Sequence, residues 1–302
     1  MTNLSKELRE KISQEFTINP ISVDLLQKSK DGTIKNGVKL HDGLLVESVL
    51  IPTESRTTAC VSSQVGCSLN CEFCATAKLK RMRNLEVAEI VDQVALIDKQ
   101  SKLYFDRPLS NIVFMGMGEP MMNYKNVVDA IRKITQEDGL GMSARRITVS
   151  TSGIPKMMKM LADENLKVKL ALSLHSAIEH KRNEIMPFST KFPLTEIMEA
   201  MQYWYDKTGS RITFEYCVWK GINDGDEDIK ALIKYCKQVP CKVNLIQYNP
   251  IGEGKFDHRS VEAEEKYVRE LEKAGITALV RRSRGGDIDA ACGQLANKNS
   301  GE

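Results

Sequence analysis

The sequence lacks the features that assign a chain to a membrane or to the secretory pathway. No stretch approaches the roughly 18 uninterrupted apolar residues of a membrane-spanning helix, so we expect no membrane association. Residues 1–7 have no apolar centre of a signal peptide, which favours a cytoplasmic protein. The chain has no repeat of fixed period and no low-complexity tract. Its 42% apolar and 27% charged residues are ordinary values that exclude wholesale disorder.

An excess of charge of one sign is missing as well. The chain has 43 Lys and Arg residues against 40 Asp and Glu residues, so its net charge is +3. This value is too small to predict a charged partner, and any binding of nucleic acid has to come from local patches. Eight cysteines are present, but a reducing cytoplasm does not support a disulfide framework. The spacing of the cysteines is therefore the informative feature.

The 302 residues divide into a short N-terminal part and a longer part in which strands and helices alternate. Apolar residues at four-residue spacing predict a helix over 1–16. Asp-Gly pairs at 31–32 and 42–43 predict hairpin turns within a small antiparallel meander over 21–51, and an extended segment follows at 57–63. The first part of the chain is therefore predicted to be a helix and a small sheet.

Short apolar strands then alternate with helical patterns, one of which ends at Gly275, a residue typical of helix ends. This alternation predicts a parallel sheet with helical crossovers, either doubly wound or a full or partial barrel. In both folds the chemistry lies at the carboxyl ends of the strands. The predicted strands cover 111–115, 146–150, 168–174, 212–218, 243–247 and 277–281.

Three of the cysteines, Cys67, Cys71 and Cys74, form a C-x3-C-x2-C motif. Thiolates this close in sequence can converge on one inorganic centre, and soft sulfur ligands select zinc or an iron–sulfur cluster. A structural zinc site needs a fourth ligand, and the local sequence offers none, since Cys60 and Cys292 lie outside the motif. Three ligands fit better a cluster that keeps one iron open, although spacing alone does not settle the choice.

The motif, with Phe73 before its last cysteine, resembles the signature of the radical S-adenosylmethionine (SAM) enzymes. In that superfamily the three cysteines bind a [4Fe–4S] cluster, and SAM chelates the remaining iron. Further segments resemble, in order, the RlmN-type adenine C2 methyltransferases, which act on 23S ribosomal RNA and transfer RNA. These segments are 60–67, 114–120, 150–153, 173–175, 243–250 and 284–295, and the resemblance covers about residues 20–296.

The resemblance implies an α/β fold, a partial (β/α)6 radical SAM barrel preceded by a small antiparallel β meander. Residues 1–52 would hold the remnant of an N-terminal accessory helix and the meander, residues 53–296 the catalytic core with the segment of the C-terminal catalytic cysteine, and residues 297–302 a polar tail. Family members carry a longer helical domain before the meander, so we expect this chain to begin inside its last helix. The implied cofactors are one [4Fe–4S] cluster per chain and SAM. The implied partners are 23S rRNA, tRNA and an electron donor such as flavodoxin, and the enzyme is expected to act as a monomer.

In this family the methyl group reaches carbon 2 of adenine through a cysteine. By position, Cys292 is the cysteine that is methylated and then forms a covalent adduct with the RNA, and Cys60 resolves that adduct by forming a disulfide. Taken without the family, either residue could be a buried structural thiol. Glu47 matches a residue proposed as proton acceptor, although a lone strand glutamate usually lies on a solvated face. The cysteines that match no catalytic position are expected in the core, and they are Cys217, Cys236 and Cys241.

Several residues at predicted strand ends match the family's SAM contacts. Phe73 would lie against the adenine of SAM, and Gly118 and Glu119 would meet its methionyl ammonium, for which a carboxylate is the expected partner. Taken singly, each of these positions is more often a satisfied loop residue. The remaining matched contacts are Ser150, Ser173, Leu174, His175 and Asn249.

Basic runs at 78–83, 145–146 and 281–284 offer sites for RNA phosphates, with solvated surface as the ordinary alternative. Because the target is one base in folded RNA, we expect that base to be splayed out of its stack. Two other functions stay open. The related Cfr-type enzyme methylates carbon 8 of the same adenosine, although Pro120 and Arg284 follow the C2 pattern. A zinc-stabilised RNA-binding protein without catalysis is the second.

Overall fold

The computed structural model describes residues 4–16, 21–252, 256 and 261–297, so most of the predicted tail lies outside the described residues. Helix α1 covers Lys6–Glu15, as the apolar spacing predicts. It begins after Ser5, whose hydroxyl accepts a hydrogen bond from the amide of Leu8. None of the residues of α1 is buried. In the part of the chain that is described, no helix is both long enough and apolar enough to span a bilayer.

The predicted meander is present as β1 (Ser22–Lys28), β2 (Ile34–Lys39) and β3 (Leu45–Pro52), which pair as antiparallel neighbours. Gly32 and Gly43 have φ values of +86° and +82°, the positive values that the Asp-Gly pairs predict. The connections are longer than two-residue hairpin turns, because the amide of Ser29 donates to the carbonyl of Thr33 and that of Gly32 to the carbonyl of Ser29.

Strand β4 (Thr57–Cys60) joins the meander to the barrel, since it pairs antiparallel with β3 and parallel with β7 (Asn111–Phe114). From β7 onward each strand lies parallel to the one before it, within a ten-stranded sheet. Within this sheet, β4 and each of the strands β7 to β11 are followed by a helix, and β12 is the last strand. This arrangement confirms the prediction of a partial barrel after a meander. The other parallel strands are β8 (Ile147–Thr151), β9 (Lys169–Ser173), β10 (Ile212–Cys217), β11 (Cys241–Ile246) and β12 (Ala278–Arg281).

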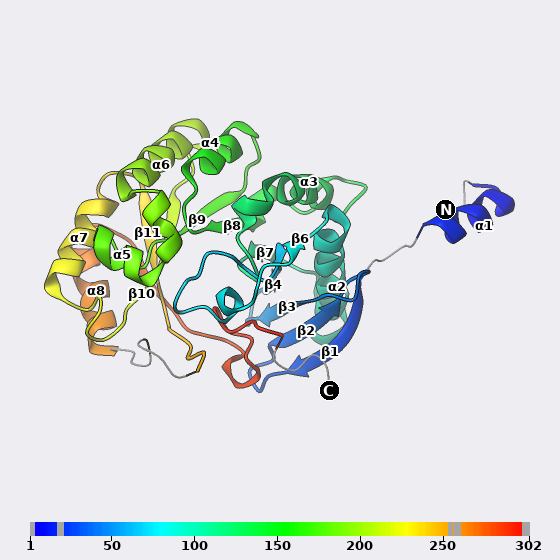
Figure 1. The fold of residues 1–302 in the computed structure, drawn as a ribbon, viewed down its shortest axis with the longest axis horizontal. Helices are drawn as coiled ribbons and strands as arrows, with labels where there is room; N and C mark the ends of the chain where they lie inside the picture. Colours follow the sequence, from blue (N-terminus) through cyan, green and yellow to red (C-terminus); the bar gives the residue numbers. More distant parts are fainter. Residues whose placement is uncertain (1–3, 17–20, 253–255, 257–260, 298–302) are drawn as a thin grey trace.

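The helices that alternate with the parallel strands lie around the outside of the curved sheet (Figure 1). Apolar residues at helical spacing explain this placement: in α3, Val127, Ile131 and Ile134 are buried. The last helix ends before Gly275, as predicted, at a φ of +75°. The α-helices are α2 (Val87–Phe105), α3 (Tyr124–Thr135), α4 (Pro155–Asp163), α5 (Glu179–Ile185), α6 (Leu194–Thr208), α7 (Asp226–Cys236) and α8 (Val261–Lys273). Short pieces are the strand pair β5 (Gln64–Val65) and β6 (Arg83–Asn84), and the 3-10 turns Ala75–Lys78, Pro120–Asn123, Ala144–Arg146, Pro187–Lys191 and Gly286–Ile288.

Residues 284–297, here called the C-terminal segment, run from β12 back to the meander (Figure 1). The amide of Gly285 donates to Asp31 at 2.9 Å, and the hydroxyl of Thr76 donates to the carbonyl of Leu295 at 2.6 Å. Asn297, which the sequence places at the start of the tail, donates its side-chain amide to the carbonyl of Leu45 in β3 at 2.8 Å. The segment therefore lies against both the meander and the loop after the cysteine motif.

Candidate active site

One cavity lies at the carboxyl ends of the parallel strands, where barrel folds carry their chemistry. The three-cysteine loop, the strand ends and the C-terminal segment form its walls. The cavity brings together most of the predicted site residues, which are far apart in the sequence. They are Cys60, Cys67, Cys71, Phe73, Cys74, Gly118, Glu119, Ser150, Ser173, His175, Asn249 and Cys292.

The three-cysteine loop is shaped by backbone contacts on two sides. Gly66, at a φ of +74°, lets the chain pass so close to Lys80 that a Cβ would lie 2.4 Å from the carbonyl oxygen of that residue. The amide of Glu72 donates to the carbonyl of Ile185 in α5 at 3.1 Å, and the amide of Ala75 donates to the carbonyl of Gly293 at 2.7 Å. The loop is therefore held between α5 and the segment that carries Cys292.

The three thiols of this loop fit an iron–sulfur cluster better than a single metal ion. Burial raises the pKa of Cys67 to about 11 and raises the pKa values of Cys71 and Cys74 as well. Thiolates are the forms that bind metal, so a bound cationic centre would offset this cost. Among the described residues, no three His, Cys, Asp or Glu side chains are grouped closely enough to hold one metal ion. Three thiols are one ligand fewer than a closed tetrahedral zinc site uses, whereas a cluster can keep one iron open to another ligand.

Phe73 and His175 form an aromatic wall of the cavity. Their ring centroids are 4.5 Å apart, and both rings pack against Trp219. Nδ1 of His175 accepts a hydrogen bond from the amide of Cys217 at 3.1 Å. Burial, and then the charge of Arg182, lowers the pKa of His175 to about 3, so the ring is neutral and its proton lies on Nε2. A histidine in this state can contact a ligand but is not a general base.

Glu119 is a buried carboxylate at the turn after β7. Its oxygens accept hydrogen bonds from the amide of Met121 at 3.0 Å and from the amide and hydroxyl of Ser152 at 2.8 and 3.0 Å. Burial raises its pKa, so a cationic ligand at this position would favour the carboxylate form. Gly118 makes the turn possible, because it has a φ of +92° and a Cβ there would lie 2.4 Å from that of Gln64. The pair can therefore hold an ammonium group.

The other predicted cofactor contacts differ in their access to the cavity. Ser150, Ser173 and Asn249 line it. The side-chain amide of Asn249 also donates to the carbonyl of Cys292 at 3.2 Å, so this residue touches the C-terminal segment directly. Leu174 is fully buried and does not line the cavity, and its amide donates to the carbonyl of Glu215. Any contact of Leu174 with a ligand would have to come through the backbone.

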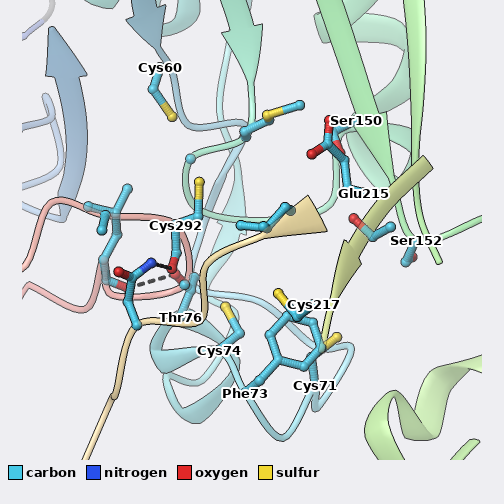
Figure 2. A pocket seen from close by; sticks show the side chains of 18 of the residues that line it. Cys60, Cys71, Phe73, Cys74, Thr76, Ser150, Ser152, Glu215, Cys217 and Cys292 are labelled. Atoms are coloured by element: carbon cyan, nitrogen blue, oxygen red, sulfur yellow. Dashed lines mark hydrogen bonds between the residues drawn. The ribbon is translucent and has the colours of Figure 1, made fainter. Parts of the chain in front are cut away.

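The side chains of Cys60 and Cys292 point toward each other, and Cys71 and Cys74 lie beyond Cys292 (Figure 2). Cys60 is buried at the end of β4, where burial and the neighbouring Cys292 raise its pKa to about 12, against an opposing effect of Arg281. Arg281 ends β12, and its own pKa is raised, first by Cys292. The structure thus assembles two thiols from opposite ends of the chain beside one guanidinium.

Glu47, like Leu174, is a predicted site residue that does not line the cavity. Its Oε1 forms an ion pair with Nζ of Lys35 at 3.1 Å, and both side chains are 2% exposed. Its Oε2 accepts hydrogen bonds from the amides of Ala296 and Asn297 at 2.8 and 3.2 Å. Glu47 therefore connects the C-terminal segment to β3, and both of its carboxylate oxygens already have a partner.

The cavity wall also includes Glu215 and Cys217, which were not predicted as site residues, and Arg281, which was predicted only as part of a basic run. Cys217 is buried, as expected for a core thiol, but it also lines the cavity. Glu215 is 3% exposed in the middle of β10, all six residues of which are buried. A carboxylate inside a fully buried strand is unusual without a partner, and that signal was available in the sequence.

Arginines of the basic runs differ in whether they are held in ion pairs within the protein. Arg83 donates to Glu89 and Asp42 at 2.7 and 2.6 Å, so it is a structural ion pair and not a free phosphate ligand. Arg282 and Arg284, by contrast, are exposed and line the cavity. They place positive charge at the mouth of the site, where a phosphate backbone would pass if a base entered.

Comparisons with known proteins agree with this geometry. Residues 61–236 match the radical SAM superfamily. The chain is 67% identical over 298 residues to the probable dual-specificity RNA methyltransferase RlmN of Flavobacterium psychrophilum, covering 99% of this chain and 86% of that relative. It is 42% identical over 299 residues to the dual-specificity RNA methyltransferase RlmN of Geotalea uraniireducens, covering 99% and 85%.

Two solved structures are also similar. A radical SAM methyltransferase from Sphaerobacter thermophilus superposes with a TM-score of 0.94 at 40% identity, covering 97% of this chain and 86% of that one. Streptococcus suis SuiB bound to S-adenosylmethionine superposes with a TM-score of 0.54 at 14% identity, covering 74% of this chain and 50% of that one, which shows a shared fold alone.

Proposed function

Because the chain belongs to the RlmN family of dual-specificity RNA methyltransferases within the radical SAM superfamily, we propose that it methylates carbon 2 of adenosine in two RNAs. The proposed targets are an adenosine of the peptidyl transferase centre of 23S rRNA and the adenosine next to the anticodon in certain tRNAs. One observation carries the proposal: a single cavity holds a three-thiol loop on one side and the facing thiols Cys60 and Cys292 on the other.

The residues of the cavity suit the two cofactors of the superfamily. Cys67, Cys71 and Cys74 would hold the [4Fe–4S] cluster, and Glu119 would accept hydrogen bonds from the ammonium group of SAM. When bound, the cluster and SAM supply a methyl group and a radical that removes hydrogen from a methyl carbon. Phe73 and neutral His175 provide the aromatic wall for an adenine ring, and their edge-on contact fixes that wall. Polar contacts would come from Ser150, Ser173, Asn249 and the backbone at Leu174.

The two facing thiols divide the covalent work. Cys292 would carry the methyl group as S-methylcysteine and bond through that carbon to carbon 2 of the base. Cys60 would then attack the sulfur of Cys292, so that a disulfide forms as the carbon–sulfur bond to the methylated base breaks. Arg281 lies near both thiols, and its positive charge opposes the rise in the pKa of Cys60. Glu47 would hold the C-terminal segment so that Cys292 faces Cys60.

The partners follow from this chemistry. RNA is the substrate class of the family, and exposed Arg282 and Arg284 at the cavity support phosphate contacts there. An electron donor such as flavodoxin would reduce the cluster. We also propose that the enzyme acts as a monomer. We also propose that the enzyme acts in the cytoplasm, where rRNA and tRNA are found.

The modified nucleoside tests the proposal. RNA from cells with and without this chain would be digested to nucleosides, and methyladenosines would be separated by liquid chromatography and identified by mass spectrometry. We expect 2-methyladenosine only where the chain is present. The isomer 8-methyladenosine would instead indicate the Cfr-type reaction, and equal methylation in both samples would contradict the proposal.

A further inference from the structure

Glu119 and Glu215 are the two carboxylates among the residues that line the cavity, and they differ in whether their oxygens are occupied. Both oxygens of Glu119 accept hydrogen bonds, from Met121 and Ser152. In Glu215, Oε1 accepts a hydrogen bond from the side chain of Asn244 at 3.0 Å, whereas Oε2 has no hydrogen-bond partner. Glu215 therefore holds an unoccupied buried acceptor at the site.

Glu215 lies in the cavity wall that the strand ends form. Glu215 pairs in register with Ser173 of β9 and Asn244 of β11, so it lies among polar side chains at the strand ends. Figure 2 shows it across the cavity from Cys60 and Cys292, on the side of Ser150. Arg281 is the nearest cation, with Nη1 3.8 Å from Oε2, too long for a hydrogen bond.

A buried carboxylate oxygen that lacks a hydrogen bond is costly, and here only the more distant charge of Arg281 offsets that cost. Burial raises the pKa of Glu215, which makes it a stronger proton acceptor than a solvated glutamate. Buried carboxyl groups in the wall of a cavity are frequent among catalytic acids and bases.

The other titratable groups at the cavity are less suitable as acceptors. Nδ1 of His175 is occupied by the amide of Cys217, and Nε2 carries the proton. Cys60 is a protonated thiol at neutral pH, since its pKa is raised to about 12. Glu47 lies outside the cavity wall, and its oxygens are occupied by Lys35 and the C-terminal segment.

We propose that Glu215, and not Glu47, faces the substrate adenine and accepts the proton of carbon 2. This inference rests on the proposed function. In the step, the bond between carbon 2 and hydrogen breaks, its electron pair stays with the ring, and the proton bonds to Oε2 of Glu215. No electron enters or leaves, so the step needs no further reactant. Arg281 balances the charge of the carboxylate before the proton arrives.

The test compares Glu215→Gln with Glu47→Gln in the reconstituted holoenzyme, on an unmodified tRNA transcript made with adenosine deuterated at carbon 2. Mass spectrometry would follow S-methylation of Cys292, the covalent protein–RNA adduct and the released nucleoside. We expect Glu215→Gln to methylate Cys292 as the wild type does and then accumulate an adduct that retains deuterium. Release should slow by about a hundredfold or more, the usual contribution of a general base. Glu215→Asp, which keeps a carboxylate, should recover part of the release rate.

Three results would overturn the inference. They are release from Glu215→Gln at the wild-type rate, a deuterated adduct in Glu47→Gln alone, and loss of Cys292 methylation in Glu215→Gln, which would mark a cofactor contact. If thermal unfolding shows that Glu215→Gln does not fold, Glu215→Asp is tested in its place. Slower release of the methylated RNA from an adduct that retains deuterium would support the inference. Release at the wild-type rate would contradict it. Wild-type enzyme that forms no 2-methyladenosine would show separately that the proposed function fails.

Discussion

The carboxylate of Glu47 accepts a hydrogen bond from the amide of Ala296 at 2.8 Å, across a separation of 249 residues. This contact ties the last described residues of the chain to the meander, four positions after Cys292. The meander therefore contributes to the candidate active site indirectly, because it fixes the path of the segment that carries the proposed catalytic thiol of Cys292.

The ion pair behind this contact should be essential for stability. Lys35→Met would leave the carboxylate of Glu47 buried without its cation, and breaking a buried pair in this way typically costs about 3 kcal/mol or more. Urea denaturation at neutral pH would measure the free energy of unfolding. Lys39→Met is the matched control, since Lys39 is exposed on the same strand and its loss should change stability by less than about 0.5 kcal/mol. If the two substitutions lowered the free energy of unfolding equally, the stabilising role of the Lys35–Glu47 ion pair would be refuted.

Cys60→Ala should accumulate a covalent protein–RNA adduct. The variant keeps Cys292, so the bond to the base can form, but it lacks the thiol that releases the product. Denaturing gel electrophoresis of enzyme incubated with substrate RNA would detect the adduct as a protein band that is shifted and sensitive to ribonuclease. Cys236→Ala is the control, because Cys236 is buried but does not line the cavity. An active preparation of Cys60→Ala with no adduct would count against the roles of the two cysteines.

Stability in acid should depend on His175. Its pKa is about 3 in the folded protein against 6.5 in the unfolded chain, so below pH 6.5 the unfolded state takes up a proton that the folded state does not. The contribution of His175 to stability is thus present above pH 6.5 and is lost as the pH falls toward 3. His175→Asn should remove this loss, because asparagine tolerates the φ of +56° and offers an acceptor to the amide of Cys217. Between pH 7 and pH 5 the apo wild type should lose about 2 kcal/mol more than the variant in urea denaturation. If the free energies of unfolding of the wild type and of His175→Asn change equally with pH, the lowered pKa of His175 would be contradicted.

Gly118→Ala should impair the site more than its backbone strain alone predicts. Both Gly118 and Gly43 have positive φ, but an added Cβ meets Gln64 at 2.4 Å in the first case and nothing within 4 Å in the second. Gly43→Ala should therefore cost about 1 kcal/mol from strain, and Gly118→Ala should in addition displace Glu119 and weaken SAM binding by at least about tenfold. Isothermal titration of the anaerobically reconstituted variants would measure both affinities. Unchanged SAM affinity in Gly118→Ala would show that this turn does not position the cofactor.

The sequence predicts most of the barrel because its signals are local. The parallel strands are runs of apolar residues such as Leu170–Leu172, separated by helices with clear periodicity, and the structure places them close to where those runs occur. The cysteine motif is local as well. Its three thiols, Phe73 and the turn at Gly118 and Glu119 can be recognised from short segments of sequence.

The rest of the site depends on contacts between distant residues. The position of Glu47 against the C-terminal segment depends on how residues 284–297 return to the meander, and no local pattern specifies that path. Arg281 lies in a basic run that gives no sign of which guanidinium turns toward the thiols. Glu215 could have been identified as an anomaly within an apolar strand, but only the folded sheet shows that it lines the cavity and that one of its oxygens lacks a hydrogen bond.

The central claim is that the methyl group passes through Cys292, and isotopic labelling tests it most directly. Purified, reconstituted enzyme would receive SAM with a fully deuterated methyl group, and the mass of the product 2-methyladenosine would be measured. Passage through S-methylcysteine with loss of one deuterium predicts a product methyl group with two deuterium atoms, and no product from Cys292→Ser. A product with three deuterium atoms, or methylation by Cys292→Ser, would contradict the account.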